Sequence, residues 1–105
     1  MELNLYWTVV AKNELQNIFS YYKEKANSGV AKKLTSGIVH ETLRLKTEPR
    51  IGQIEELLSK HAQEYRYLVY KNYKIIYWIN EKKNRIEIAD VFDTRQNPVK
   101  INRSE

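Results

Sequence analysis

The sequence predicts a small α+β domain of the order β-α-α-β-β-β, with a helical hairpin packed on one face of a small antiparallel sheet. Three observations predict this fold class. Residues 64–98 hold three runs rich in Tyr, Ile, Val, Phe and Trp, separated by Lys71-Asn72 and by residues 80–84, as in strands joined by hairpins. Residues 8–47 carry apolar stripes with helical spacing. Residues 1–7 alternate as a strand does.

The first strand leads into a helix. Leu3, Leu5 and Trp7 alternate with Glu2, Asn4 and Tyr6, which is the period-two pattern of a strand. Thr8 is a suitable N-cap, because its hydroxyl can accept a hydrogen bond from the amide near Ala11. The helix is expected to continue to about residue 26. Its apolar stripe comprises Ala11, Leu15, Ile18 and Tyr22.

A second helix follows the break at residues 27–29, with Ser28 as a plausible cap. Pro49 disfavours helical geometry in the residue before it, so this helix is expected to end near Thr47. Gly37, inside the helix, costs about 1 kcal/mol relative to Ala and predicts close packing there. The apolar stripe comprises Ala31, Leu34, Ile38 and Leu45, widened by Val30, Val39 and Leu43. The resulting helical hairpin is the natural cover for one face of the meander.

The middle strand of the meander carries apolar bulk on both faces. Tyr73, Ile75, Tyr77 and Ile79 fall on one face, and Lys74, Ile76 and Trp78 on the other. Something must therefore pack on one face, while the other is a partly apolar groove or a partner surface. Arg66, Lys74 and Arg95 are placed so that three cations can converge at one end of the sheet.

Size and composition indicate one domain over residues 1–105, with a short polar tail from about residue 94. The absence of Cys excludes disulfides and thiolate zinc sites and fits a reducing cytoplasm. No apolar run approaches the roughly 20 residues of a membrane span, and no signal segment is evident, so a cytoplasmic protein without membrane contact is expected. His40 and His61 lie far apart without a ligand pattern, so neither a metal nor a cofactor is expected.

The net charge of +5, from 18 Lys and Arg against 13 Asp and Glu, favours anionic partners. Nucleic acid and an acidic protein segment both meet that description, because long-range attraction raises the encounter rate with either. Lysines on solvated helix faces would give the same composition.

Several landmarks occur in a characteristic order. They are Trp7, Ala11, Leu15, Ile18, Pro49-x-x-Gly52, Tyr65-Arg66, Tyr73-Lys-Ile-Ile-Tyr77, Val91-Phe92 and Arg95-Gln-Asn-Pro98. Together with the element order, they resemble the RelE/ParE superfamily of toxins from bacterial type II toxin–antitoxin modules, over nearly the whole chain. No single motif is specific for the family. The order and spacing of the motifs within a short basic protein are fairly specific. The resemblance implies a toxin that forms a hetero-oligomer with a small acidic antitoxin encoded by the adjacent gene.

The resemblance also implies one of two mechanisms. RelE-like members cleave mRNA on the ribosome with basic residues on the sheet and a Tyr or His near the C-terminus, whereas ParE-like members inhibit DNA gyrase and cut nothing. Lys74 stands where the nuclease branch has an Arg, Arg66 near a Lys of that branch, and Arg95 near its second Arg. Pro98 stands where that branch ends its motif in Tyr, and no His follows His61. The resemblance therefore favours a ParE-like toxin that is not an enzyme.

Alternatives remain at this point. Other nuclease members place a Glu before the second strand, and Glu55 or Glu56 would fill that role in a ribosome-dependent endoribonuclease. The same two residues suit an exposed helical charge pair, and the three cations suit solvated strand positions that discourage edge pairing. A non-toxic basic binding module is a third possibility.

A sheet face with exposed rings and cations would suit an antitoxin segment that docks as a helix or adds as a strand. The candidates for contact with the antitoxin or the target are Arg66, Tyr77, Trp78 and Arg95.

Overall fold

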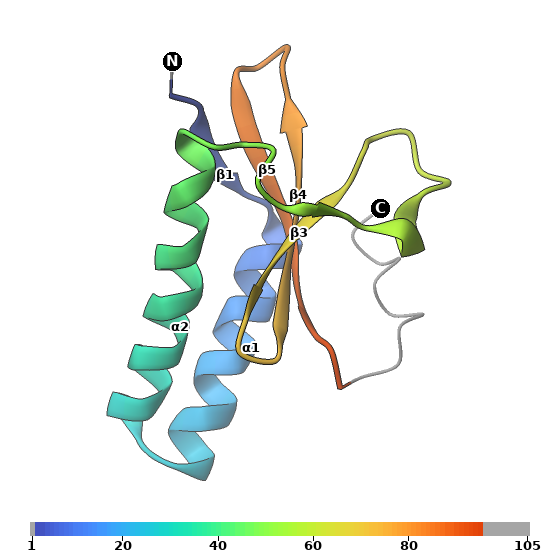
Figure 1. The fold of residues 1–105 in the computed structure, drawn as a ribbon. Coiled ribbons are helices and arrows are strands. Elements are labelled where there is room, and N and C mark those ends of the chain that lie inside the picture. The colour runs from blue at the N-terminus through green and yellow to red at the C-terminus, as the bar shows by residue number, and fades with distance from the viewer. Residues whose placement is uncertain (1, 96–105) are drawn as a thin grey trace.

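The computed structural model describes residues 2–95 of the chain. The predicted α+β fold is confirmed, with a helical hairpin on one side of the sheet (Figure 1). The elements are β1 (Asn4–Trp7), α1 (Val9–Lys25), α2 (Ser28–Thr42), the 3-10 turn η1 (Leu43–Lys46), β2 (Gln53–Ile54), the 3-10 turn η2 (Glu56–Leu58), β3 (Arg66–Tyr70), β4 (Tyr73–Asn80) and β5 (Arg85–Asp93). The predicted tail from residue 94 lies outside the described residues beyond Arg95, and so does Pro98.

The sheet has the strand order β1-β5-β4-β3-β2. The meander β3-β4-β5 is antiparallel as predicted, and β1 returns to lie parallel to β5, with Leu5 opposite Ile86. The sequence did not predict β2, because two residues are too few to show alternation. Its pairing with β3 attaches the segment after the helices to the edge of the sheet.

Each helix begins at a side-chain cap. The Thr8 hydroxyl accepts from the Ala11 amide at 3.2 Å, as predicted, and donates to the Ile88 carbonyl at 3.0 Å, which ties the start of α1 to β5. The cap of α2 is Asn27, whose side-chain oxygen accepts from the Val30 amide at 2.8 Å. The prediction of Ser28 was therefore wrong by one residue: Asn27 has the extended backbone of a cap, while Ser28 is already helical.

The stripe of the second helix is narrower than predicted. Its four main residues, Ala31, Leu34, Ile38 and Leu45, are buried. The predicted widening was wrong, because the residues proposed for it are exposed; they are Val30, Val39 and Leu43. The helix ends at Thr42, and η1 continues the coil to Lys46, close to the predicted end at Thr47.

The close packing predicted at Gly37 is confirmed. A Cβ atom at this position would lie 2.1 Å from the Tyr70 hydroxyl and 2.4 Å from the ring carbon that bears it. Glycine thus lets α2 rest directly on the ring of a β3 residue. The ring of Tyr70 is held between helix and sheet in consequence.

The main core lies between the helical hairpin and the sheet. It is built around the buried residues Ala11, Leu34, Ile38, Leu45, Leu68, Tyr73, Ile75, Tyr77, Ile86, Ile88 and Val91. A bulge in β5 shapes it: Tyr77 pairs with Ile88 and Ile76 with Asp90, which leaves Ala89 as an extra residue. Because of this extra residue, Ile88 and Val91 both face the helices although three positions separate them.

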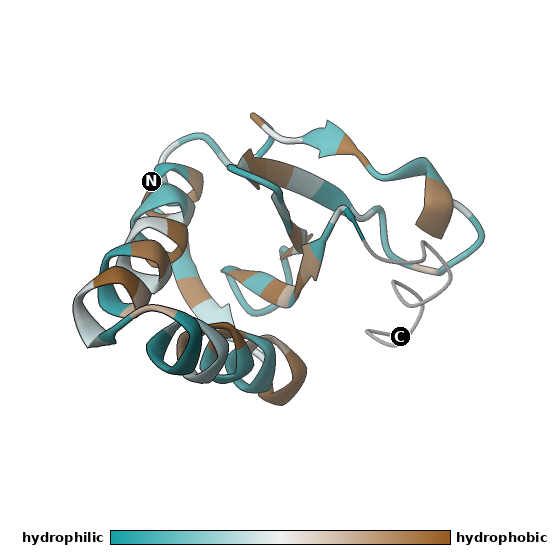
Figure 2. Cartoon of the chain, turned by 90° about the horizontal axis from the view of Figure 1, so that it is seen from below, coloured by the Kyte–Doolittle hydropathy of each residue, from teal (hydrophilic) through white to brown (hydrophobic). Residues whose placement is uncertain are grey.

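The opposite face of the sheet is partly covered by the chain itself. Figure 2 shows η2 on the side of the sheet away from the helices. Leu58 of η2 forms a second buried cluster with Tyr65, Ile76, Ala89 and Phe92. Tyr67 and Trp78 pack on this cluster and stay half-exposed. The second face, predicted to be a partly apolar groove or a partner surface, is thus only partly open to a partner.

Candidate functional site

Arg66 lies on the helix side of the sheet. It pairs with Tyr77 across the β3–β4 ladder, and directly opposed residues share a face. Its guanidinium donates to the Gly52 carbonyl at 2.9 Å and forms an ion pair with Glu64 at 3.1 Å. Arg66 therefore binds the loop that precedes β2, and its hydrogen bonds mainly stabilise the fold.

Tyr77 is fully buried, which contradicts its predicted place on a contact surface. Its hydroxyl donates to the Pro49 carbonyl at 2.7 Å and accepts from the Gly52 amide at 3.0 Å. Burial raises the pKa of Tyr77, so the hydroxyl stays protonated and able to donate. The Pro49-x-x-Gly52 landmark is thus a loop closed by a tyrosine of β4. Trp78, by contrast, lies half-exposed on the other face.

Lys74 lies on the face opposite to Arg66. Its ammonium group is 2.8 Å from a carboxylate oxygen of Glu55 and 4.2 Å from the centre of the Tyr67 ring. Glu55 is only 4% exposed and also accepts from the Leu57 amide at 3.2 Å, which caps η2. Glu56 is exposed in η2. The pair Lys74–Glu55 fastens the η2 segment to the sheet.

Arg95 follows the end of β5 and is paired with Asp93. Two guanidinium nitrogens lie 3.1 and 2.9 Å from the two carboxylate oxygens, and the Arg95 amide donates to the first of them at 2.9 Å. The hydrogen bonds from Arg95 lower the pKa of Asp93 to about 2. The Arg95 guanidinium is still exposed on its outer side.

The predicted convergence of the three cations was wrong. Arg66 and Lys74 lie on opposite faces of the sheet, and each of the three cations is held by a carboxylate of its own. The length of the β3–β4 turn could have shown that the two cations lie apart. A two-residue turn puts Tyr70 opposite Tyr73, so Arg66 falls opposite Tyr77 and on the other face from Lys74.

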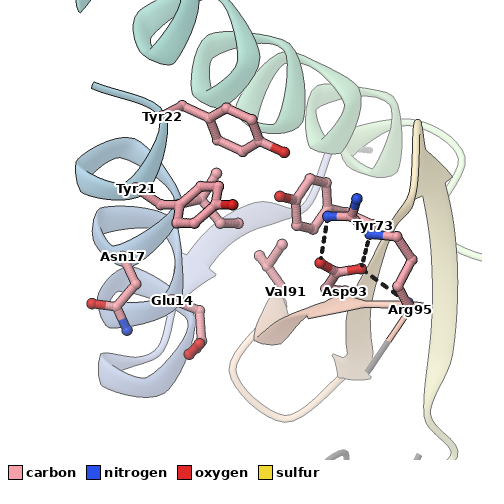
Figure 3. A pocket seen from close by; sticks show the side chains of 9 residues that line it. Glu14, Asn17, Tyr21, Tyr22, Tyr73, Val91, Asp93 and Arg95 are labelled. Carbon is pink, nitrogen blue, oxygen red and sulfur yellow. Dashed lines mark hydrogen bonds and ion pairs between the residues drawn. The ribbon is translucent and has the colours of Figure 1, made fainter. Parts of the chain in front are cut away.

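A cleft of about 530 Å³, here called the tyrosine cleft, lies between α1 and the adjacent ends of β4 and β5 (Figure 3). The sequence did not predict it. The residues that line it are Glu14, Asn17, Ile18, Tyr21, Tyr22, Tyr73, Val91, Asp93 and Arg95. Its sequence signals were the Tyr21-Tyr22 doublet late in the first helix and the Asp93-x-Arg95 spacing after the last strand.

The chemistry of this cleft suits binding. Figure 3 shows Tyr21 and Tyr22 projecting from α1 toward the side where Tyr73 and Arg95 lie. The rings of Tyr21 and Tyr22 meet edge to face, with centroids 5.0 Å apart. Burial, followed by the neighbouring Tyr22 hydroxyl, raises the pKa of Tyr73, so Tyr73 is a neutral hydrogen-bonding group at physiological pH. The cleft thus offers rings, hydroxyls and the outer side of Arg95 to a partner.

Nowhere in residues 2–95 do three or more His, Asp or Glu side chains gather as metal ligands would. No helix in the same range is long and apolar enough to cross a lipid bilayer.

The element order, the hairpin-covered sheet and the Pro49-x-x-Gly52 loop define a toxin fold of the RelE/ParE kind, and comparison with known proteins agrees. Residues 5–98 match the family model described as the ParE toxin of the type II toxin–antitoxin system, parDE. The chain belongs to this family.

A solved structure described as the chromosomal ParDE TA system from P. aeruginosa is similar, with a TM-score of 0.72. Sequence identity is 19%, and the likeness covers 88% of this chain and 96% of that one. At that identity the likeness shows the fold. No curated protein matches the chain in sequence.

Proposed function

We propose that this toxin stops growth by a ParE-like action on DNA gyrase, without cutting RNA, and that a cognate antitoxin neutralises it. One observation carries the choice of mechanism: the three candidate cations lie apart, and each is paired with a carboxylate. The family supports the rest, because the ParE-like members that the chain resembles are gyrase inhibitors held by an antitoxin.

RNA cleavage by 2′-hydroxyl attack requires a base, cations around the phosphate and an acid for the leaving oxygen. Of the two candidate bases, Glu55 is buried and paired with Lys74 at 2.8 Å, and Glu56 is exposed in η2. Arg66, on the opposite face, donates to loop carbonyls. A phosphate would have to displace these partners, and because Arg66 and Lys74 lie on opposite faces of the sheet, one phosphate could not contact both. The described residues therefore favour a toxin that binds its target over one that cleaves it.

The charge of the chain supports an antitoxin partner. A net charge of +5 is complementary to a small acidic protein, and such attraction accelerates association. The uncovered part of the second face and the tyrosine cleft both offer rings and polar groups to a wrapping segment.

Induced expression in cells that lack the antitoxin tests this function. We expect growth arrest with loss of normal plasmid supercoiling and with transcripts that remain whole. Mapping of transcript ends in the same cells provides the contrast. Codon-positioned cuts in mRNA together with unchanged supercoiling would support the RelE-like endoribonuclease instead, and harmless expression would support a non-toxic binding module.

A further inference from the structure

A second cleft, here called the lysine notch, lies between the start of α2 and the β3–β4 turn. Its volume is about 290 Å³, at the lower end of the range for ligand pockets. Apolar and aromatic side chains form most of it, and two lysines stand among them. The six residues that matter here are Tyr22, Val30, Lys33, Leu34, Tyr70 and Lys71.

The walls of the notch are firmly held. Leu34 is only 8% exposed and belongs to the main core. Tyr70 rests against Gly37, where α2 has no side chain to push the ring away. Val30, at 45% exposed, offers apolar surface that no described residue covers. A cavity with such walls is a place for an apolar side chain.

The charge of the notch has one sign. Lys33 comes from α2 and Lys71 from the turn, and no acidic residue lines the notch. Within residues 2–95 neither lysine takes part in an ion pair; Lys71 lies 5.8 Å from the centre of the Tyr70 ring. These two differ from Arg66, Lys74 and Arg95, which are all paired.

The backbone at Lys71 is strained. Its φ of 54° lies in the left-handed region, which Gly adopts more readily than a residue with a Cβ atom. The turn is fixed at its other residue, because the Asn72 carbonyl accepts from the amide and the hydroxyl of Thr94, each at 2.9 Å. Glycine would suit this turn better than lysine. The geometry of the turn therefore does not explain why a lysine stands here.

We propose that the lysine notch docks an amphipathic segment of the antitoxin, with an apolar side chain in the notch and Asp or Glu side chains beside Lys33 and Lys71. This inference rests on the proposed function and adds the place and chemistry of the contact. The two lysines could pair with either a carboxylate or a phosphate, but only a peptide would also place an apolar side chain against Val30 and Leu34, so the aliphatic walls favour a peptide. Tyr22 lines both the notch and the tyrosine cleft, so a segment leaving the notch can continue into that cleft.

Charge reversal at the notch is the test. The variants are Lys33→Glu, Lys71→Glu, their combination, and Val30→Glu. Lys32→Glu is the matched control, because Lys32 precedes Lys33 on α2, is exposed and does not line the notch. Affinity is measured by calorimetry with the purified product of the reading frame adjoining the toxin gene, and thermal unfolding confirms that each variant is folded.

We expect the double variant to bind roughly tenfold or more weakly at about 0.1 M salt, with a smaller loss at about 0.5 M, since salt screens exposed charges. Val30→Glu should weaken binding at both salt concentrations. Lys71→Gly adds a check on folding: it relieves the backbone and removes the charge, so it should unfold at a higher temperature than the wild type and still bind less tightly.

Three outcomes would overturn the inference. If the wild type binds and the notch variants bind as tightly as Lys32→Glu, the notch assignment alone is wrong. If the notch variants keep that affinity but lose affinity for duplex DNA, the notch contacts nucleic acid. If the wild type does not bind the adjoining product at all, neutralisation by that partner fails and the notch proposal fails with it.

Discussion

The tyrosine at position 77 links the landmark loop to the sheet through one buried hydroxyl. Its two hydrogen bonds, to the Pro49 carbonyl and from the Gly52 amide, span 28 and 25 residues of sequence. A Cβ atom at Gly52 would lie 2.6 Å from the same hydroxyl, so the loop can approach this closely only with glycine there. Tyr77 thus holds the loop in place, but as a fully buried residue it does not itself contact a partner.

Tyr77→Phe should destabilise the protein by about 1–3 kcal/mol, because it leaves the buried Gly52 amide without its acceptor. Denaturant unfolding followed by circular dichroism measures the difference. Tyr67→Phe is the matched control: its hydroxyl makes one exposed hydrogen bond, to Gln53, and its removal should cost less than about 1 kcal/mol. Equal stability of Tyr77→Phe and wild type would contradict the account of the loop.

Asp93 gives the fold an acid-dependent contribution. Its pKa in the folded protein is about 2, below the ordinary value of 3.8, chiefly because Arg95 hydrogen-bonds to the carboxylate. A lowered folded-state pKa stabilises the fold above the unfolded-state value, and this contribution is lost as the pH falls toward the folded-state value. The contribution is therefore complete above about pH 4 and disappears toward pH 2.

Asp93→Asn should accordingly unfold at a lower temperature than the wild type at pH 6, and the gap should narrow as the pH falls from about 4 to 2. Thermal unfolding of both proteins across this range measures it. A gap that stays constant from pH 6 to pH 2 would mean that the ion pair with Arg95 does not stabilise the fold.

At the scale of single elements, the helices were predictable because their signals are local. The Thr8 cap and the core-facing stripes depend on spacings of three and four residues, and both were confirmed. Val30, Val39 and Leu43 were placed in the core wrongly, since an apolar residue on a helix does not reveal whether a neighbour covers it. Their exposure is a property of how the hairpin sits on the sheet.

The strands were predictable in position and alternation, yet the site was not. Alternation separated Tyr77 from Trp78 correctly, but it did not show that the loop before β2 buries Tyr77. The partners of the cations were invisible for the same reason: Glu55 reaches Lys74 from 19 positions away through a segment without periodicity. The β5 bulge also depends on a long-range pairing.

The α2 cap offers a test at the scale of one element. Asn27→Ala should cost about 1 kcal/mol, because the Val30 amide loses its acceptor at the first turn. Ser28→Ala, one residue later, should leave stability nearly unchanged, since Ser28 is not the cap. Denaturant midpoints of the two variants decide between the positions, and a larger loss from Ser28→Ala would contradict the cap observed here.

At the scale of the whole molecule, the two faces of the sheet have different roles. One is sealed by the helical hairpin, and the other is half covered by η2 and the residues after it. Surfaces open to partners include the uncovered part of the second face, and the tyrosine cleft and lysine notch, which share Tyr22. A protein of 105 residues can thus present separate surfaces to an antitoxin and to a target.

We propose that this ParE-family toxin inhibits gyrase by binding to it and does not act on RNA. The decisive measurement is the supercoiling of relaxed plasmid by purified gyrase, first with increasing amounts of toxin and then with antitoxin added. We predict loss of supercoiled product as toxin is added and recovery when the antitoxin is present. Full supercoiling activity in the presence of a toxin preparation that still arrests growth when expressed would contradict the claim.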